Sequence, residues 1–277
     1  MGVRTAPGVE LALAVELTSG DPRFGGFSGM ATDGRTLWLL SDRAVLWQAR
    51  LGGLPRTLRL DGWQAGPIHR DAADRSALDS ETLAFAADGA LVAGFEQDGS
   101  LRRLEADGAG GWATRRLQDG SPLVDSPVNR GLEAATELGD GSFLVLSEGA
   151  RQAPDIALGA RLGPDGPTPV TYRTAPGFSP VGAALAGDRV LVLERSVGVL
   201  TGWQTRVTAS GLPAWMAAGP VVGEELLRIG AGPLAENYEG ITALALEDGS
   251  RLLLLVADDN QSPLQRTLLL VFLWRSA

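Results

Sequence analysis

The feature that most constrains the fold is a pattern of apolar segments and tight turns that occurs five times along the chain. In each copy a short segment leads to a turn, usually Asp-Gly, and a strongly apolar segment follows that ends in an acidic residue. The copies occupy residues 27–43, 79–96, 129–148, 178–195 and 237–260. Asp-Gly between two apolar runs indicates a β-hairpin, because both central residues of a type I′ turn need positive φ. The pattern therefore predicts hairpins that recur about every 50 residues.

This spacing fits one four-stranded propeller blade with its loops and is too long for most helical repeats. The second strand of each hairpin is almost uniformly apolar, as expected for a strand buried on both faces between neighbouring sheets. We therefore predict an all-β fold, a single β-propeller domain over residues 1–277 with about five four-stranded blades. Six blades are the alternative, but residues 202–236 contain no second apolar strand that ends in an acid.

The two ends of the chain complete the predicted ring. The last copy is one strand short, because the strand expected at residues 267–274 ends the chain. The strand expected at residues 9–17 belongs to no complete copy. Pairing of these two strands would close the ring and cover sheet edges that otherwise invite aggregation.

The composition of the chain limits the classes of partner and of chemical site that are expected. The formal net charge of -9 and pI ≈ 4.7 disfavour nucleic acids and anionic membranes, which bind basic surfaces. The absence of cysteine excludes disulfides, thiolate metal sites and a cysteine nucleophile. No run of eighteen apolar residues is present, so no membrane insertion is expected. The N-terminus lacks the pattern of a secretory signal peptide, and we expect a monomer.

The acidic residues of the repeat are expected at one end of the ring. The first strand of a hairpin starts at the edge to which its antiparallel partner returns, so the acids at both positions share that edge. The predicted metal ligands are Asp42, Glu81, Glu96, Glu133, Glu148, Glu239, Asp258 and Asp259. The fourth copy departs from the pattern, with Gly182 at the first position and Glu194 at the second.

Carboxylates this close would raise one another's pKa unless positive charge lies nearby. A hard cation such as calcium or magnesium suits an oxygen-rich site without cysteine. Pairing with Arg43, Arg130 or Arg195 is the alternative without a metal. A third possibility is that several acids point outward to water and never meet.

The motifs at these positions resemble the phytase-like family described as having esterase-like activity, whose members are mostly bacterial β-propellers. The matching segments are residues 27–30, 40–43, 79–81, 129–133, 237–240, 258–260 and 265–267, in this order. The resemblance extends over nearly the whole chain, about residues 9–274. It implies a calcium-associated hydrolase of phosphate or other esters that is often periplasmic or secreted. Thr82 departs from the family motif, in which glycine follows the glutamate.

The sequence therefore leaves two functions open. One is a calcium-dependent esterase or phosphoesterase acting on a small anionic ester in the axial funnel, with Arg43, Arg130 and Arg195 binding the anion. The other is a propeller that binds a ligand or partner without catalysis and holds calcium for structure. His69, the one histidine, is a candidate general base, although a lone loop histidine is more often a bystander. Ser28 lies outside a G-x-S-x-G motif, which disfavours a serine hydrolase.

Overall fold

The computed structural model describes residues 2–69, 79–95, 99–119 and 132–275. Regular structure in these ranges is β-strand, apart from the short 3-10 helix η2 (Leu212–Trp215). No helix in the described ranges has the length and apolar character needed to cross a membrane. The chain is thus an all-β protein, as its repeats predict.

The strands fall into groups that follow the chain order. The first two groups are β3 (Phe27–Thr32), β4 (Thr36–Ser41), β5 (Val45–Gly52) and β6 (Arg59–His69), then β7 (Ser80–Phe85), β8 (Leu91–Phe95), β9 (Ser100–Ala106) and β10 (Trp112–Asp119). The next two are β11 (Leu132–Glu137), β12 (Phe143–Ala153), β13 (Ile156–Gly163) and β14 (Gly166–Arg173), then β15 (Ser179–Ala186), β16 (Arg189–Gly198), β17 (Gly202–Gly211) and β19 (Glu224–Ile229). The last is β20 (Asn237–Ala245), β21 (Arg251–Asp258), β22 (Leu268–Trp274) and β2 (Val9–Glu16). Within each group, neighbouring strands pair antiparallel.

Hydrogen bonds join these groups into four sheets. The first two groups form one eight-stranded sheet, because β6 and β10 pair in parallel over a short stretch at their outer edges. Two short strands extend other sheets: β18 (Pro220–Val221) pairs with β14, and β1 (Val3–Thr5) pairs with β19. Residues 202–236, where a sixth blade would have to lie, thus supply β17 and β19 to the fourth group and β18 to the third.

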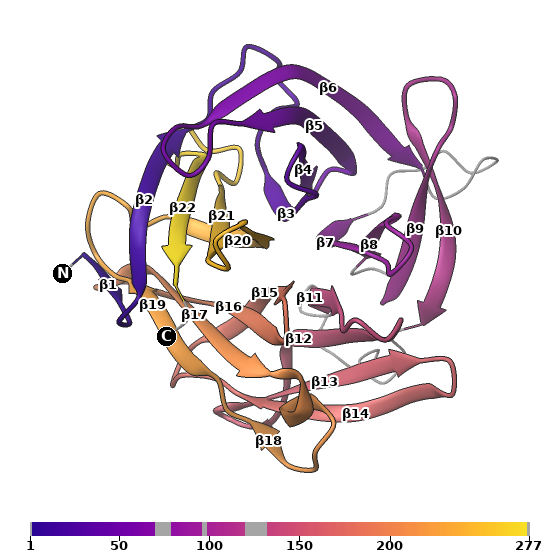
Figure 1. Ribbon diagram of the computed structural model, residues 1–277, viewed down its shortest axis with the longest axis vertical. Helices are drawn as coiled ribbons and strands as arrows, with labels where there is room; N and C mark the ends of the chain where they lie inside the picture. The colour runs from indigo at the N-terminus through magenta and orange to yellow at the C-terminus, as the bar shows by residue number, and fades with distance from the viewer. Residues whose placement is uncertain (1, 70–78, 96–98, 120–131, 276–277) are drawn as a thin grey trace.

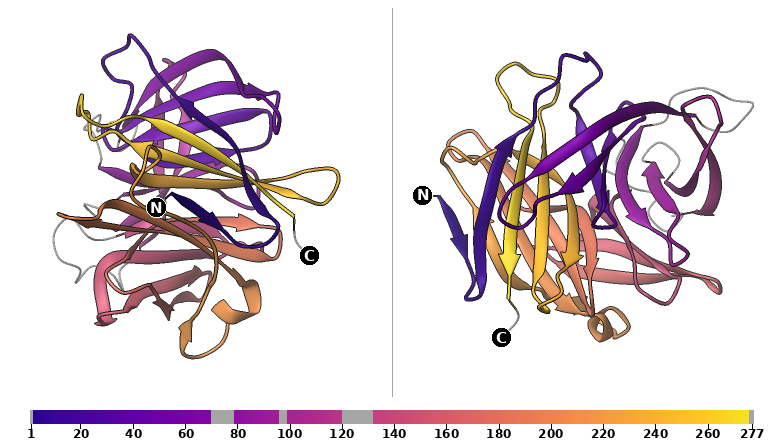
Figure 2. Two further views of the ribbon diagram at one scale, coloured as in Figure 1. Left: turned by 90° about the vertical axis from the view of Figure 1, so that its left-hand side faces the viewer. Right: turned by 45° about the horizontal axis from the view of Figure 1, so that its top comes forward.

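The first strands of the five groups face a common axis. Each of β3, β7, β11 and β15 contacts the next, and β20 contacts both β15 and β3, so the contacts close a ring (Figure 1). A narrow cavity of about 170 Å³ lies along this axis and is lined by residues of all five strands. The side views show the sheets standing around the axis (Figure 2).

The two ends of the chain meet in one sheet, as the sequence predicts. β2 pairs antiparallel with β22 over residues 9–16 and 268–274, so the N-terminal strand lies outside the C-terminal one (Figure 1). This pairing covers the edge of β22.

The second strands carry the core. All of residues 252–256 on β21 are fully buried, because this strand is packed between the first group on one side and the fourth on the other. Such burial contributes roughly 1.5–3 kcal/mol for each leucine or valine side chain. The packing holds the ends of the strands, where the acidic residues lie, in fixed positions.

Candidate functional site

Each of the five axial strands carries one β-bulge at the same place. The extra residue is Ser28 on β3, Glu81 on β7, Glu133 on β11, Val181 on β15 and Glu239 on β20. A bulge leaves one residue unpaired and redirects its side chain, and such features recur beside functional sites. The first acidic position of the repeat is therefore a bulge position.

The bulges also correct the alignment of the fourth group. The residue after each bulge pairs with Leu40, Gly94, Leu146, Leu193 or Val256 on the second strand. Two residues further along lie Asp42, position 96, Glu148, Arg195 and Asp258. The expectation that Gly182 and Glu194 fill the two rim positions of the fourth copy is therefore wrong. Val181 and Arg195 fill them, so this group places an arginine where the others have an acid.

Arg195 connects the third, fourth and fifth groups. Its Nη2 donates to Glu148 Oε1 at 3.0 Å, and its Nη1 donates to Asn237 Oδ1 at 2.8 Å and to Glu239 Oε1. The side chains of Arg195, Glu148 and Glu239 are 17%, 18% and 13% exposed. Burial lowers the pKa of Arg195, but Glu239, Glu148 and Glu133 outweigh this effect and raise it. Arginine pairing, the alternative to a metal, thus accounts for part of the acidic cluster. We call the surroundings of Asp42, Glu148, Arg195, Glu239 and Asp258 the acidic mouth.

Three carboxylates of the acidic mouth have raised pKa values. Burial raises the pKa of Asp258 to about 7, with further contributions from Glu239, Asp42 and Asp259. Burial also raises the pKa of Glu239, where Arg195 opposes the shift and Asp42 adds to it. The pKa of Asp42 is raised by burial against the opposing effects of Ser41 and Arg43. On the side of the mouth formed by the first and fifth groups, burial thus favours the protonated form of the carboxyl groups, and the described residues supply too little positive charge to offset it.

Asp259 binds the loops beside the mouth. Its Oδ1 accepts hydrogen bonds from the backbone N–H groups of Gly26 and Gln261 at 3.0 Å each, and its Oδ2 accepts one from Thr267 Oγ1 at 2.8 Å. Both oxygens are thus used within the protein. Asp259 is better placed to position residues 25–26 against Asp42 than to bind a ligand.

The remaining predicted residues are placed as follows. Arg43 is exposed beside Asp42, and its guanidinium makes no ion pair or hydrogen bond with the described residues. Glu81 is half-buried at its bulge on β7. His69 ends β6, the outermost strand of its group, roughly 14 Å from the axial strand at the usual strand spacing. Glu96 and Arg130 lie outside the described residues.

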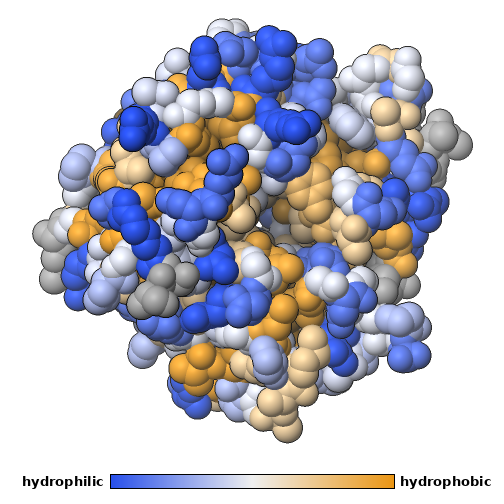
Figure 3. Space-filling model, viewed as in Figure 1, coloured by the Kyte–Doolittle hydropathy of each residue, from blue (hydrophilic) through white to orange (hydrophobic). Residues whose placement is uncertain are grey.

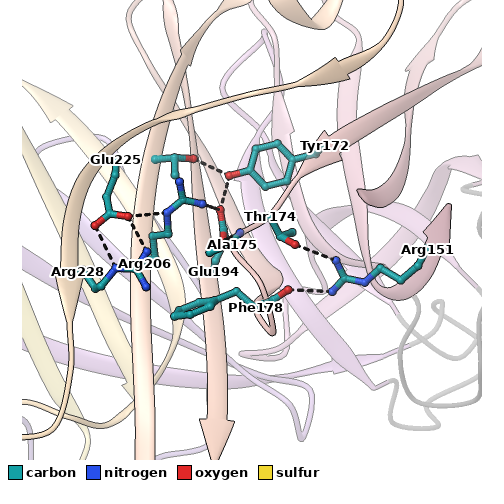
Figure 4. A network of polar contacts seen from close by, with 10 residues as sticks. Arg151, Tyr172, Thr174, Ala175, Phe178, Glu194, Arg206, Glu225 and Arg228 are labelled. Atoms are coloured by element: carbon teal, nitrogen blue, oxygen red, sulfur yellow. Dashed lines mark hydrogen bonds and ion pairs between the residues drawn. The ribbon is translucent and has the colours of Figure 1, made fainter. Parts of the chain in front are cut away.

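Glu194 belongs to a separate buried network (Figure 4). It is fully buried and accepts hydrogen bonds from the Tyr172 hydroxyl, from Arg206 Nη1 at 2.7 Å and from the Ala175 N–H at 3.0 Å. Arg206 also donates to Glu225, which Arg228 binds as well. Because successive side chains of β16 point to opposite faces, Glu194 lies in this network and Arg195 lies at the mouth.

The donor groups of the acidic mouth fit a cation in part. Its oxygen donors suit calcium, and the raised pKa values of its carboxylates show that a positive charge beside them would be favourable. Among the described residues, however, no three histidine, cysteine, aspartate or glutamate side chains form a group that could hold a metal. A cation there would need amide, backbone or water oxygens in addition.

Sequence reasoning missed Asn237 as a member of the mouth. Its Nδ2 donates to Glu239 Oε1 at 3.0 Å, while its Oδ1 accepts from Arg195. The residue begins β20 and pairs with Asp258, two positions before the bulge. Its place in the motif Asn-Tyr-Glu-Gly was the available signal.

The profile of a family described as "Phytase-like: Esterase-like activity of phytase" matches residues 22–261. Among solved structures, a luciferin-regenerating enzyme is similar with a TM-score of 0.50 and 10% identity, over 96% of this chain and 97% of that chain. A thermostable family-43 glycoside hydrolase also has a TM-score of 0.50 and 10% identity, over 91% of this chain and 89% of that chain. A virginiamycin B lyase from Staphylococcus aureus has a TM-score of 0.42 and 10% identity, over 94% of this chain and 69% of that chain. No curated protein sequence matches. At 10% identity, the two structures with a TM-score of 0.50 share with this chain a fold alone, the β-propeller.

Proposed function

The chain belongs to the phytase-like family with esterase-like activity, and from this premise we propose that it hydrolyses a small anionic ester at the acidic mouth. The observation that carries the proposal is the convergence of Asp42, Glu239 and Asp258, all with raised pKa values, beside the exposed Arg43. Carboxylates with perturbed pKa values that lie close together are typical of catalytic centres.

The residues of the mouth suggest distinct roles. Asp258, with a pKa of about 7 in the absence of a cation, can release its proton near neutral pH when a cation binds beside it. Arg43 can bind the negative charge of a phosphate or carboxylate, because its guanidinium has no partner among the described residues. Arg195 already binds two carboxylates, so it orients Glu148 and Glu239 in this proposal and does not bind the ester.

We further propose that the mouth binds calcium through Asp42 and Asp258, with backbone and water oxygens as its further ligands. Bound calcium would polarise the ester or phosphoryl oxygen. Arg195 reduces the charge on the side of Glu148, so the binding side is that of the first and fifth groups.

The closed ring of contacts among the axial strands supports a count of five blades, the last completed by β2. In this interpretation the eight-stranded sheet is two blades joined at their outer edges through β6 and β10.

The proposal is tested by assaying the purified protein on p-nitrophenyl phosphate and p-nitrophenyl acetate, with calcium and then with a chelator. We expect turnover that the chelator abolishes. The Arg43→Gln variant should raise KM for the phosphate ester more than for the neutral acetate ester. Arg35→Gln is the control, because Arg35 lies at the β3–β4 turn at the other end of the hairpin. Equal KM values for the two variants would remove Arg43 from the site.

One observation favours a second function, a ligand-binding propeller without catalysis. Arg195 satisfies Glu148 and Glu239 internally, so this half of the mouth is stable without substrate chemistry. Absence of turnover on both esters, together with a calcium-dependent rise in melting temperature, would support this function.

A further inference from the structure

A separate cleft of about 640 Å³ lies between the first and second groups of strands. Its walls include Trp38 on β4, Phe85 on β7 and Trp112 on β10. Asp33 and Gly89, at the β3–β4 and β7–β8 turns, also line it, so it opens at the end of the hairpins opposite Asp42. Its volume lies within the range of small-molecule sites, about 300–1,000 Å³.

The cleft has aromatic walls that the protein leaves partly uncovered. Trp38 and Phe85 meet edge to face, with ring centroids 5.4 Å apart, and both pack with Trp112 against a buried cluster that includes Leu91 and Leu104. All three aromatic side chains remain partly exposed. Hydrophobic residues gather on the surface between β4, β5 and β7–β9 (Figure 3). Aromatic surface collected in a concavity typically marks a binding site.

A chain of hydrogen-bonded side chains leads from this cleft into an adjoining hollow. The Trp38 indole N–H donates to Gln48 Oε1 at 3.2 Å, and Gln48 Nε2 donates to Gln64 Oε1 at 2.7 Å. The relay ends at the exposed Gln64, whose Nε2 donates to no described residue. Gln64 and Trp112 also line an adjoining hollow of about 350 Å³. A ligand lying on the aromatic walls would thus meet an oriented amide donor at its edge.

The charge of the lining favours a neutral ligand. Among the described residues that line the larger cleft, Asp33 is the one ionisable side chain, and its Oδ1 accepts from the backbone N–H groups of Arg35 and Thr36. A carboxylate beside amide donors accepts hydrogen bonds from hydroxyl groups and repels anions. The ester proposed for the acidic mouth would therefore not be favoured here.

We propose that this cleft binds a neutral carbohydrate. A pyranose ring presents a C–H face that packs on aromatic rings and a rim of hydroxyl groups that pairs with amides and carboxylates. The cleft is held open in advance, because β6 and β10 are joined through the pairs Ile68–Trp112 and His69–Ala113 at the outer edge. Little ordering would then accompany binding.

The test is an array of neutral and uronic-acid oligosaccharides probed with the whole protein, followed by isothermal titration of the strongest binder. We expect saturable binding of a neutral oligosaccharide. Trp112→Ala should weaken it at least tenfold, and Gln64→Ala roughly three- to tenfold, the effect of one hydrogen bond. The matched control is Trp63→Ala, because Trp63 precedes Gln64 on β6 but packs on the opposite side, 5.8 Å from Phe24.

Gln64 is exposed, so its variant keeps the test valid if Trp112→Ala fails to fold. Three results would overturn the proposal: binding confined to acidic oligosaccharides, binding to none, or affinity that neither cleft substitution changes. Loss of affinity in Trp63→Ala equal to that in Gln64→Ala would place the ligand elsewhere. None of these results depends on ester hydrolysis.

Discussion

Replacing Arg195 by methionine tests the electrostatics of the acidic mouth directly. The substitution keeps much of the apolar stem but leaves Glu148 and Glu239 without their cation. Removing one partner of a buried ion pair typically costs about 3–5 kcal/mol. The three side chains are 13–18% exposed, so we expect a loss near the lower end, about 3 kcal/mol. This corresponds to a fall in Tm of roughly 6–12 °C for a domain of this size.

Calcium should then restore much of the lost stability. A ligand at 100 times its Kd stabilises the native state by about 2.7 kcal/mol, which is comparable with the expected loss. The assay is thermal unfolding of wild type and Arg195→Met, each with calcium, magnesium or chelator. We expect the variant to gain more from calcium than wild type, because two further carboxylates become available as ligands.

Arg206→Met is the matched control. Arg206 is 14% exposed and also binds two carboxylates, those of Glu194 and Glu225, but it lies in the other buried network. It should lose similar stability and gain little from calcium. An unchanged Tm for Arg195→Met would refute the ion-pair argument, and equal recovery of both variants by calcium would refute the cation site.

Two further predictions concern the same end of the ring. The pKa of Asp258 is about 7 in the folded protein and near 4 when unfolded, so the native state binds the extra proton and stability falls as pH rises from about 4 to 7. Asp258→Asn should flatten this pH dependence. At pH 8 and without calcium, urea unfolding should show the variant to be more stable than wild type by up to about 4 kcal/mol. A variant with the wild-type pH profile would contradict the raised pKa of Asp258. Gly26→Ala should destabilise the protein more than Gly141→Ala. Both glycines have positive φ, 63° at Gly26 and 84° at Gly141. A Cβ atom added at Gly26 would lie 2.6 Å from Asp42 Oδ1, whereas a Cβ atom added at Gly141 would have no atom of the described residues within 4 Å. Equal losses of about 1–2 kcal/mol in chemical unfolding would mean that backbone strain alone matters.

The sequence predicted the hairpins and the meeting of the chain ends, because turn chemistry and apolar runs are local signals. It could not predict the register of the fourth group. Side chains alternate along a strand, so a shift of one residue exchanges the two faces and sends Glu194 away from the mouth and Arg195 into it. The deciding bulge falls on Val181, and the equivalent positions hold serine in one copy and glutamate in three. No residue type marks the bulge.

The cleft between the first two groups could not be predicted from the sequence, for a different reason. Its walls come from seven strands, and Trp38 and Trp112 are separated by more than one repeat. Each tryptophan alone fits packing between sheets. Only the arrangement of the strands shows that both rings border one opening.

The asymmetry of the fourth group suggests where a ligand binds at the mouth. Exact repetition would bring the same charge to the axis from every group. Arg195 balances Glu148 on one side, whereas on the other side Asp42 raises the pKa of Asp258. Asp42→Asn should therefore weaken calcium binding by at least tenfold in isothermal titration, whereas Glu148→Gln should change it little or strengthen it by freeing Arg195 for Glu239 alone. If both substitutions weaken binding equally, the arginine does not divide the mouth, and the cation must lie on the axis itself.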